Sequence, residues 1–499
     1  MPVNIVRLPD PLPTQVVARR ASVAPRSLTG DLPGDIVLEI LKNLEDKDAV
    51  HLASVSKAFY AAFPPRPTNV TYKSLVKAIS LQERLAQTPG AALRLVSLDV
   101  RCPGPASKIS PILCDILSEA RNLRSLTCGP AELKSDNVRN IIQRLAHLAH
   151  LQLYVPPISA LTTTSYPSSL SSLYLVGFKG GITWKELATS LSRLTGLKKL
   201  SLLNSLLDES DPDDDLDEND TDDEDEDGGA TPALPTVTSL AVSSSDLPSL
   251  AFFAKTFPNV NDLVLEETHF PEDDEADTDV ADRVIHKVSF LVSEDVEYAL
   301  PWQAEHVRLF TFDIGQINLE SGLCGMDGLI GLALRVLSFS WDSWTEQISS
   351  SIPQTVRLLE LESFDTDFPM TLGFFANVFE EHSPEAVGEL PALTVLSIAA
   401  PSSPGPLDEL RARFFEHAAL ALPKLRYVAL ASPRQIPQDF SDLAGDRAPW
   451  RWWRIIRSAG QDVEFREIPA WEGERVRRYF RDANREKAER FDEDFSALR

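Results

Sequence analysis

The stretch Leu197-Lys198-Lys199-Leu200-Ser201-Leu202 places apolar residues at its first, fourth and sixth positions. The same template recurs twelve times after residue 90, at spacings of 22 to 47 residues. One match would mean little in a chain rich in leucine, but twelve in series indicate an internal repeat. The copies begin at Leu93, Leu123, Leu148, Leu170, Leu197, Val237, Val260, Val307, Leu334, Val356, Leu393 and Leu425.

Segments with helical periodicity lie between the copies, for example Ser110–Ala120 and Trp184–Leu194. A short strand followed by a helix that returns to a parallel neighbour is the unit of a βα solenoid. We therefore predict an α/β fold in which residues 93–431 form a curved solenoid of about twelve irregular repeats. This region resembles leucine-rich-repeat proteins, although it lacks the Asn or Cys that ideal repeats carry after the strand.

The net charge of −26 is concentrated in two acidic runs. Asp208–Asp227 holds 15 acidic residues and no basic one, and Glu272–Asp282 holds 7 more. Such runs repel themselves and cannot bury apolar surface, so we expect disordered insertions at 208–229 and 271–282. They either keep the protein soluble or dock a basic partner. Clustered Lys and Arg and long apolar runs are both lacking, so we expect neither nucleic acid nor membrane as a partner.

A second informative stretch is Leu32–Leu44, with the sequence LPGDIVLEILKNL. Pro33 suits the first turn of a helix, where its missing N–H has no intrahelical partner. Ile36, Ile40 and Leu44 then share one helical face. Two more short helices are predicted before residue 64. Three helices in about 35 residues cannot bury this apolar surface alone, so a partner is expected.

This stretch and its continuation through Asp48, Leu52 and Val55-Ser56-Lys57-Ala58-Phe59 resemble the F-box. The departure is Ala49, where the family usually has leucine. The resemblance implies that residues 29–66 form a three-helix F-box that binds a Skp-type adaptor and, through it, a cullin. The implied adaptor contacts are Leu32, Pro33, Ile36, Ile40, Leu44 and Leu52. The alternative is a generic amphipathic helical hairpin that caps the array.

The remaining segments flank these two regions. We expect a disordered leader at 1–28 and a linker helix within 67–92 that holds the repeats rigidly relative to the F-box. Residues 432–499 are predicted to form a cap and a charged helix. Within them, the cluster of Trp450, Trp452 and Trp453 is expected to cover the open end of the last repeat. A peptide-binding patch is the alternative reading of the three tryptophans.

Motifs of catalysis are not found in the sequence: it has no G-x-S-x-G, H-E-x-x-H, Walker or dinucleotide-binding pattern. We therefore expect no enzyme activity, metal or cofactor. The F-box and the repeats together suggest the substrate-recognition subunit of an SCF-type ubiquitin ligase. The alternative is a repeat scaffold or transport factor that binds the adaptor outside a ligase. The four cysteines form no C-x-x-C pair, which fits the cytosol or nucleus.

Target contacts are predicted at template positions that point away from the repeat core. They are Tyr154, Tyr174, Asp262, Glu266, Asp313, Glu360 and Glu362. The acidic members should create a negative potential that attracts a basic segment of the target protein. The alternative is that these residues are merely solvated. The predicted face has no pocket of arginines of the kind that would bind a phosphorylated degron.

Overall fold

The computed structural model describes the chain between Thr68 and Phe495 in a series of segments. They are residues 68–87, 92–102, 106–129, 133, 135–156, 161, 166–177, 179–204, 206–208, 232–243, 247–266, 268, 283–292, 303–313, 323, 326–338, 352–363, 390–399, 415, 418–419, 421–431, 450–457 and 463–495. The predicted leader and F-box lie outside these residues, as do both predicted insertions apart from Asp208. Two compact units divide near residue 151, with residues 166–170 belonging to the first unit. Each unit is described by itself.

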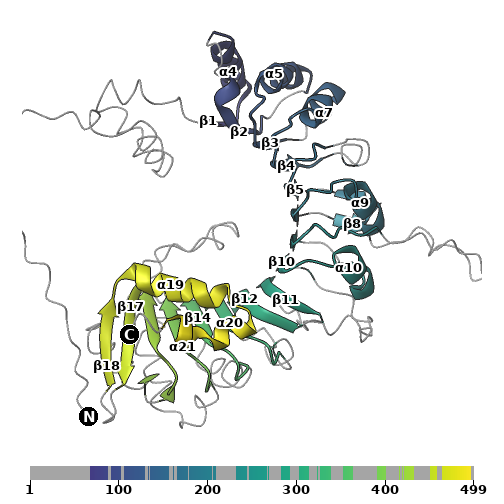
Figure 1. Ribbon diagram of the computed structural model, residues 1–499. Coiled ribbons are helices and arrows are strands. Elements are labelled where there is room, and N and C mark those ends of the chain that lie inside the picture. Colours follow the sequence, from purple (N-terminus) through teal and green to yellow (C-terminus); the bar gives the residue numbers. More distant parts are fainter. Residues whose placement is uncertain are drawn as a thin grey trace, which may run out of the picture. The chain divides into compact units, whose positions relative to one another are not determined.

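The N-terminal unit is built from alternating strands and helices. Its elements are β1 (Thr68–Tyr72), α4 (Leu75–Gln87), η1 (Ala92–Arg94), β2 (Leu95–Val100), α5 (Ala106–Glu119), β3 (Ser125–Cys128), α7 (Asp136–Gln143) and the start of β4 (His150–Tyr154). Strands β1, β2 and β3 pair in parallel, and α4, α5 and α7 lie along one side of them (Figure 1). Leu98 and Leu126 are register partners with 0% exposure, so alternate strand residues fill the core as the template predicts.

The segment expected to be a linker helix carries a strand as well. Helix α4 occupies residues 75–87, and β1 precedes it and pairs in parallel with β2. Gln82 on α4 donates a hydrogen bond to Asp115 on α5 over 2.6 Å. Residues 68–87 therefore have the same βα form as the repeats that follow.

The C-terminal unit continues the parallel arrangement. Its elements up to the last parallel strand are β5 (Ser172–Val176), β6 (Lys179–Thr183), α9 (Trp184–Leu191), β7 (Lys199–Leu203), β8 (Leu206–Asp208), β9 (Ser239–Ser243), α10 (Leu250–Thr256), β10 (Asp262–Glu266), β11 (Val284–Val292), β12 (Gln303–Asp313), β13 (Gly331–Ser338), β14 (Leu358–Ser363), β15 (Val395–Ala399) and β16 (Tyr427–Ala431). Except for β6 and β8, which form a separate pair, these strands follow one another in chain order in one sheet.

Local sequence accounts for the beginning of helix α9. The Thr183 hydroxyl accepts a hydrogen bond from the Glu186 N–H, and the Glu186 carboxylate accepts one from the Thr183 N–H. This reciprocal capping box satisfies two backbone donors that the first turn leaves unpaired. Asp208 was predicted to belong to the acidic insertion. In the structure it ends β8 and is the register partner of Thr183.

The predicted repeat register is wrong at two copies. The templates beginning at Val307 and Leu334 place Phe310 and Leu337 in the core, whereas the buried pair in the structure is Leu309 opposite Leu334. Strand residues alternate between faces, so an odd shift along the strand moves each side chain to the other face. Strand β11 was not predicted, although its buried residues Val288 and Phe290 follow the same template.

The chain ends with an antiparallel hairpin and three helices. These are β17 (Arg451–Arg457), β18 (Val463–Ile468), α19 (Ala470–Arg481), α20 (Arg485–Glu489) and α21 (Phe491–Asp494). Strand β17 pairs antiparallel with β16 and so occupies the edge of the last parallel strand. Within the described segments, no helix has the length and apolar character needed to cross a membrane.

Candidate functional site

The strands of the C-terminal unit present a second face, which we define as the residues that alternate with the repeat core. Parallel register aligns these residues in rows across the sheet. The first row is Asp262, Lys287, His306, Gly331, Leu358, Val395 and Tyr427. The next row is Val264, Ser289, Arg308, Ala333, Glu360, Ser397 and Ala429. The first row therefore changes from charged or polar residues on β10–β12 to apolar residues on β14–β16.

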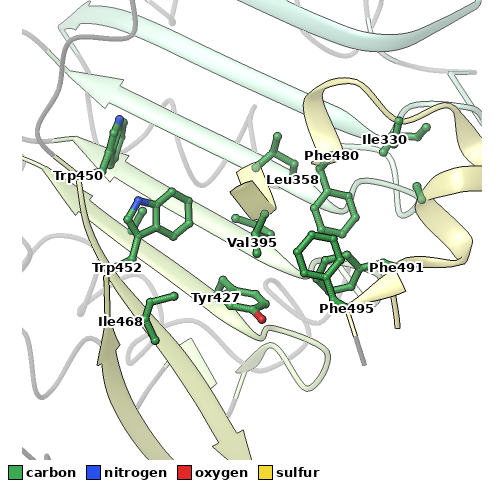
Figure 2. Packing of buried hydrophobic residues seen from close by; sticks show 14 of the residues in the cluster. Ile330, Leu358, Val395, Tyr427, Trp450, Trp452, Ile468, Phe480, Phe491 and Phe495 are labelled. Carbon is green, nitrogen blue, oxygen red and sulfur yellow. The ribbon is translucent and has the colours of Figure 1, made fainter. Parts of the chain in front are cut away.

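The C-terminal tail, defined as residues 469–495, lies over this second face. Figure 1 shows α19 and α20 crossing the strands near β12 and β14. Phe480 and Phe491 of the tail pack with Leu358, Val395 and Tyr427 of the sheet in one buried cluster (Figure 2). Phe480 has 0% exposure, and the ring centroids of Tyr427 and Phe491 lie 6.2 Å apart in an edge-on arrangement. The second face is therefore the floor of a second hydrophobic core.

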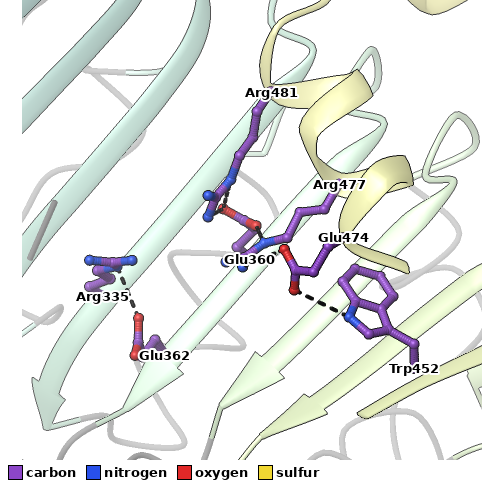
Figure 3. A network of polar contacts seen from close by, with 7 residues as sticks. All are labelled: Arg335, Glu360, Glu362, Trp452, Glu474, Arg477 and Arg481. Carbon is purple, nitrogen blue, oxygen red and sulfur yellow. Dashed lines mark hydrogen bonds and ion pairs between the residues drawn. The ribbon is translucent and has the colours of Figure 1, made fainter. Parts of the chain in front are cut away.

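An ion network lies beside this core (Figure 3). Glu360 of β14 accepts hydrogen bonds from Arg477 and Arg481 of α19, the second over 2.8 Å from Nη2. The side chains of Glu360 and Arg477 are almost fully buried. Burial by itself raises the pKa of the Glu360 carboxyl, but the two guanidiniums outweigh it and lower the pKa to about 2. Glu360 is therefore ionised and held by two cations of its own chain.

The charged end of the first row holds the tail by polar contacts. The Lys287 ammonium lies 2.9 Å from the Asp482 carboxylate. His306 is buried, and its Nε2 lies 2.8 Å from the Ala483 carbonyl oxygen. Burial lowers the pKa of His306 to about 4, so the imidazole is neutral and Nε2 donates the bond to that carbonyl. These contacts fix the turn between α19 and α20.

The structure separates the predicted target residues into different environments. The prediction that Glu360 offers an accessible charge is wrong, because α19 covers it. Glu362 is half-buried and pairs with Arg335 over 2.9 Å. Asp262 is half-buried and accepts a hydrogen bond from Ser239 over 3.1 Å. Asp313 ends β12, and its side chain lies outside the described residues.

The other three candidates lie on strands that come earlier in the sheet than β14, which carries Glu360. Tyr154 and Tyr174 are half-buried residues of β4 and β5, and Glu266 is the half-buried last residue of β10. Gln152 donates a hydrogen bond to the Tyr154 hydroxyl over 3.1 Å. The structure therefore does not bring the seven candidates together in one patch.

Sequence reasoning missed the second core, although a signal for it was present. Strands β15 and β16 read VLSIA and YVALA, and every residue of β15 is buried. Strands that are apolar at nearly every position are typical of sheets covered on both faces. Strand β10, with the alternating sequence DLVLE, is the contrast. The change in pattern along the array indicated where a second layer would pack.

Across the segments that the structure describes, no three His, Cys, Asp or Glu side chains are grouped so that they could hold a metal ion.

Comparison with known families bears on the N-terminal stretch. The F-box domain matches residues 30–64, which include Leu32 and the other five predicted adaptor contacts. The chain carries an F-box domain at these residues. No curated protein matches the chain. The matched segment lies outside the described residues, so the predicted contacts of Leu32, Pro33, Ile36, Ile40, Leu44 and Leu52 stay predictions.

Proposed function

We propose that this F-box protein is the substrate-recognition subunit of an SCF-type ubiquitin ligase. F-box domains bind Skp-type adaptors, and adaptors of this kind typically join SCF complexes. The F-box match at residues 30–64 is the observation that carries the proposal. In this role the F-box binds the adaptor, the adaptor links to a cullin, and the repeat array binds a protein target. We place this activity in the cytosol or nucleus, where such ligases meet their targets.

The array supports a binding role for physical reasons. Parallel strands in chain order give a long surface of side chains in fixed rows, and such surfaces suit protein recognition. The tail covers the second face over β11–β17, so we assign target binding to the strands of the C-terminal unit that precede β11. Asp262 and Glu266 lie there and keep the acidic character expected to attract a basic target segment.

The test of adaptor binding uses the double variant Leu32→Asp/Ile36→Asp. Two aspartates on the apolar face would be buried unpaired in the complex, which costs several kcal/mol. We expect co-purification of both the adaptor and the cullin to be lost. The matched control is Val284→Asp/Trp471→Asp, which changes two exposed apolar residues to aspartate. Adaptor binding by the first variant equal to that of the control would refute the assignment of the F-box face.

The second candidate function is a scaffold or transport factor that binds the adaptor outside a ligase. The F-box specifies adaptor binding and is common to both functions. Quantitative co-purification distinguishes them, because a ligase subunit brings down adaptor and cullin in equal amounts. Recovery of the adaptor without cullin would favour the scaffold.

A further inference from the structure

A cavity of about 700 Å³ opens where β16 begins and β17 ends. A volume of this size lies within the roughly 300–1,000 Å³ typical of small-molecule sites. Six cationic residues and two acidic ones line it. The cationic residues are Arg357, Lys424, Arg426, Arg454, Arg457 and Arg466, and the acidic ones are Glu489 and Asp492. The cavity therefore has a marked excess of positive charge.

Three of the six cations are neutralised by carboxylates. Arg426 pairs with Asp492 of the tail, with a contact of 2.9 Å between Nη2 and Oδ2. Arg466 pairs with Glu464 over 3.1 Å, and Arg454 pairs with Glu472. These pairs hold the walls of the cavity in place, and we do not assign them to ligand binding.

The other three cations have no carboxylate within ion-pair distance among the described residues. Arg357 donates to the Ala488 carbonyl over 3.2 Å, which leaves its charge uncompensated. Arg457 donates to three backbone carbonyls, including Leu422 over 2.9 Å. Burial, followed by the neighbouring Arg426, lowers the pKa of Arg457, as expected where cations are crowded. Lys424 is exposed at the rim. Three cations without a carboxylate partner, from three separate segments of the chain, thus line one cavity.

The remaining walls are apolar. Tyr427, Ile455, Phe491 and Phe495 line the cavity between the cations. Phe491 and Phe495 belong to the second core, and their ring centroids lie 4.7 Å apart. Because the rings are packed there, this side of the cavity is preformed. This apolar wall suits the carbon skeleton of a ligand whose charged end contacts the cations.

We propose that this cavity binds a phosphate monoester, with Arg357 and Lys424 contacting the phosphate and the aromatic wall contacting its carbon substituent. A phosphate monoester carries a charge of about −1.5 to −2 at pH 7, which compensates more of the excess than one carboxylate does. Guanidinium groups match the geometry of phosphate oxygens by paired hydrogen bonds. The aromatic wall favours an organic phosphate over the inorganic ion, because only an organic phosphate has a carbon substituent to contact the rings.

Direct binding to the purified full-length protein tests this site. Titration calorimetry would compare phenyl phosphate, inorganic phosphate and benzoate at equal ionic strength. We expect phenyl phosphate to bind most tightly, because it alone supplies both a divalent anion and a ring. Equal binding of phenyl phosphate and benzoate would overturn the assignment to phosphate.

The double variant Arg357→Gln/Lys424→Gln should reduce phenyl phosphate affinity at least about tenfold, since each charge-assisted hydrogen bond is worth more than a neutral one. Arg457 is left unchanged because its carbonyl contacts support the fold. The matched control, Arg193→Gln/Lys198→Gln, removes the same two charges at exposed positions between α9 and β7. Affinity that falls equally in both variants would reflect net charge alone and would refute the site.

The phosphate monoester could belong to a phosphorylated protein target or to a small molecule. A further binding experiment distinguishes these two sources. A degenerate peptide library containing phosphoserine is compared with free phosphoserine and with the unphosphorylated library. Tighter binding of the phosphorylated library assigns the phosphate to a protein target, an assignment that rests on the proposed function. Equal binding of free phosphoserine assigns it to a small molecule. Both arms omit adaptor and cullin, so their outcome is independent of the adaptor test.

Discussion

Gly473 of α19 lies directly against the indole ring of Trp452 on β17. A Cβ atom built at Gly473 would lie 2.1 Å from the Cγ atom of Trp452, far inside contact distance. Trp452 is fully buried and donates a hydrogen bond from its ring nitrogen to Glu474 over 3.3 Å. The backbone of α19 is therefore seated on a ring that cannot move aside easily. This contact sets how close the tail comes to the sheet.

The first prediction is that Gly473→Ala destabilises the tail. Alanine in a helix is ordinarily more favourable than glycine by about 0.8–1 kcal/mol, but here overpacking costs about 1–3 kcal/mol and reverses the sign. Thermal unfolding followed by tryptophan fluorescence measures the effect. Gly328→Ala is the matched control, because a Cβ there meets nothing within 4 Å. A stabilised Gly473 variant would contradict the packing.

The second prediction concerns the ion network. Glu360→Gln removes the buried carboxylate that both Arg477 and Arg481 contact, and breaking a buried ion pair by removing one partner costs about 3–5 kcal/mol. Chemical denaturation should show this loss in the unfolding of the C-terminal unit. The control Glu467→Gln breaks an exposed pair with Arg451 and should change stability by less than about 1 kcal/mol. Similar costs for the two variants would show that Glu360 is hydrated.

The third prediction is a pH dependence that comes from His306. The folded pKa of about 4 lies below the ordinary 6.5, so the unfolded chain binds more protons between these values. Stability is then complete above pH 6.5 and falls as the pH drops toward 4, by an amount on the order of 3 kcal/mol. His306→Gln should flatten this part of the stability curve. The exposed His147→Gln is the control, and a wild-type slope in the His306 variant would contradict the prediction.

The fourth prediction locates the target surface. Asp262→Lys/Glu266→Lys should weaken target capture and reduce its salt dependence, because an attractive potential becomes repulsive. Adaptor binding should persist. Glu83→Lys/Glu119→Lys reverses two exposed charges on helices α4 and α5 and is the control. Capture that is insensitive to the first change would move the site away from β10.

The sequence predicted the repeat architecture but not its details. The twelve templates correctly marked strands such as β7, β10 and β15, since the alternation of buried residues is a local property of the chain. The register failed at β12 and β13 because each strand has apolar residues at both odd and even positions, such as Leu309 and Phe310 in β12, and the template matched the wrong set. Strand β11 was not predicted because it directly follows an acidic run, and the long gap between templates there was attributed to an insertion.

The position of the tail could not be predicted from local pattern. The sequence has an apolar stripe at Val476, Tyr479, Phe480 and Ala483. Such a stripe by itself leaves open whether the helix docks and where. Its partner Glu360 is 117 residues from Arg477 in the chain. Whether these two residues meet depends on the positions of all the repeats that lie between them in the chain. The arginine-lined cavity was missed for the same reason, because its cations come from four separate segments.

The tail also has a consequence for the order of biosynthesis. In most repeat arrays each unit can settle on its neighbour as soon as it emerges from the ribosome. Here the apolar residues Leu358, Val395 and Tyr427 pack in one buried cluster with residues of the segment 476–495, which is translated after them. Their surface therefore stays exposed to water until that segment has been translated and has packed on it. Premature termination before residue 470 would leave this apolar surface exposed to solvent. Chaperones and proteases would then recognise the truncated chain.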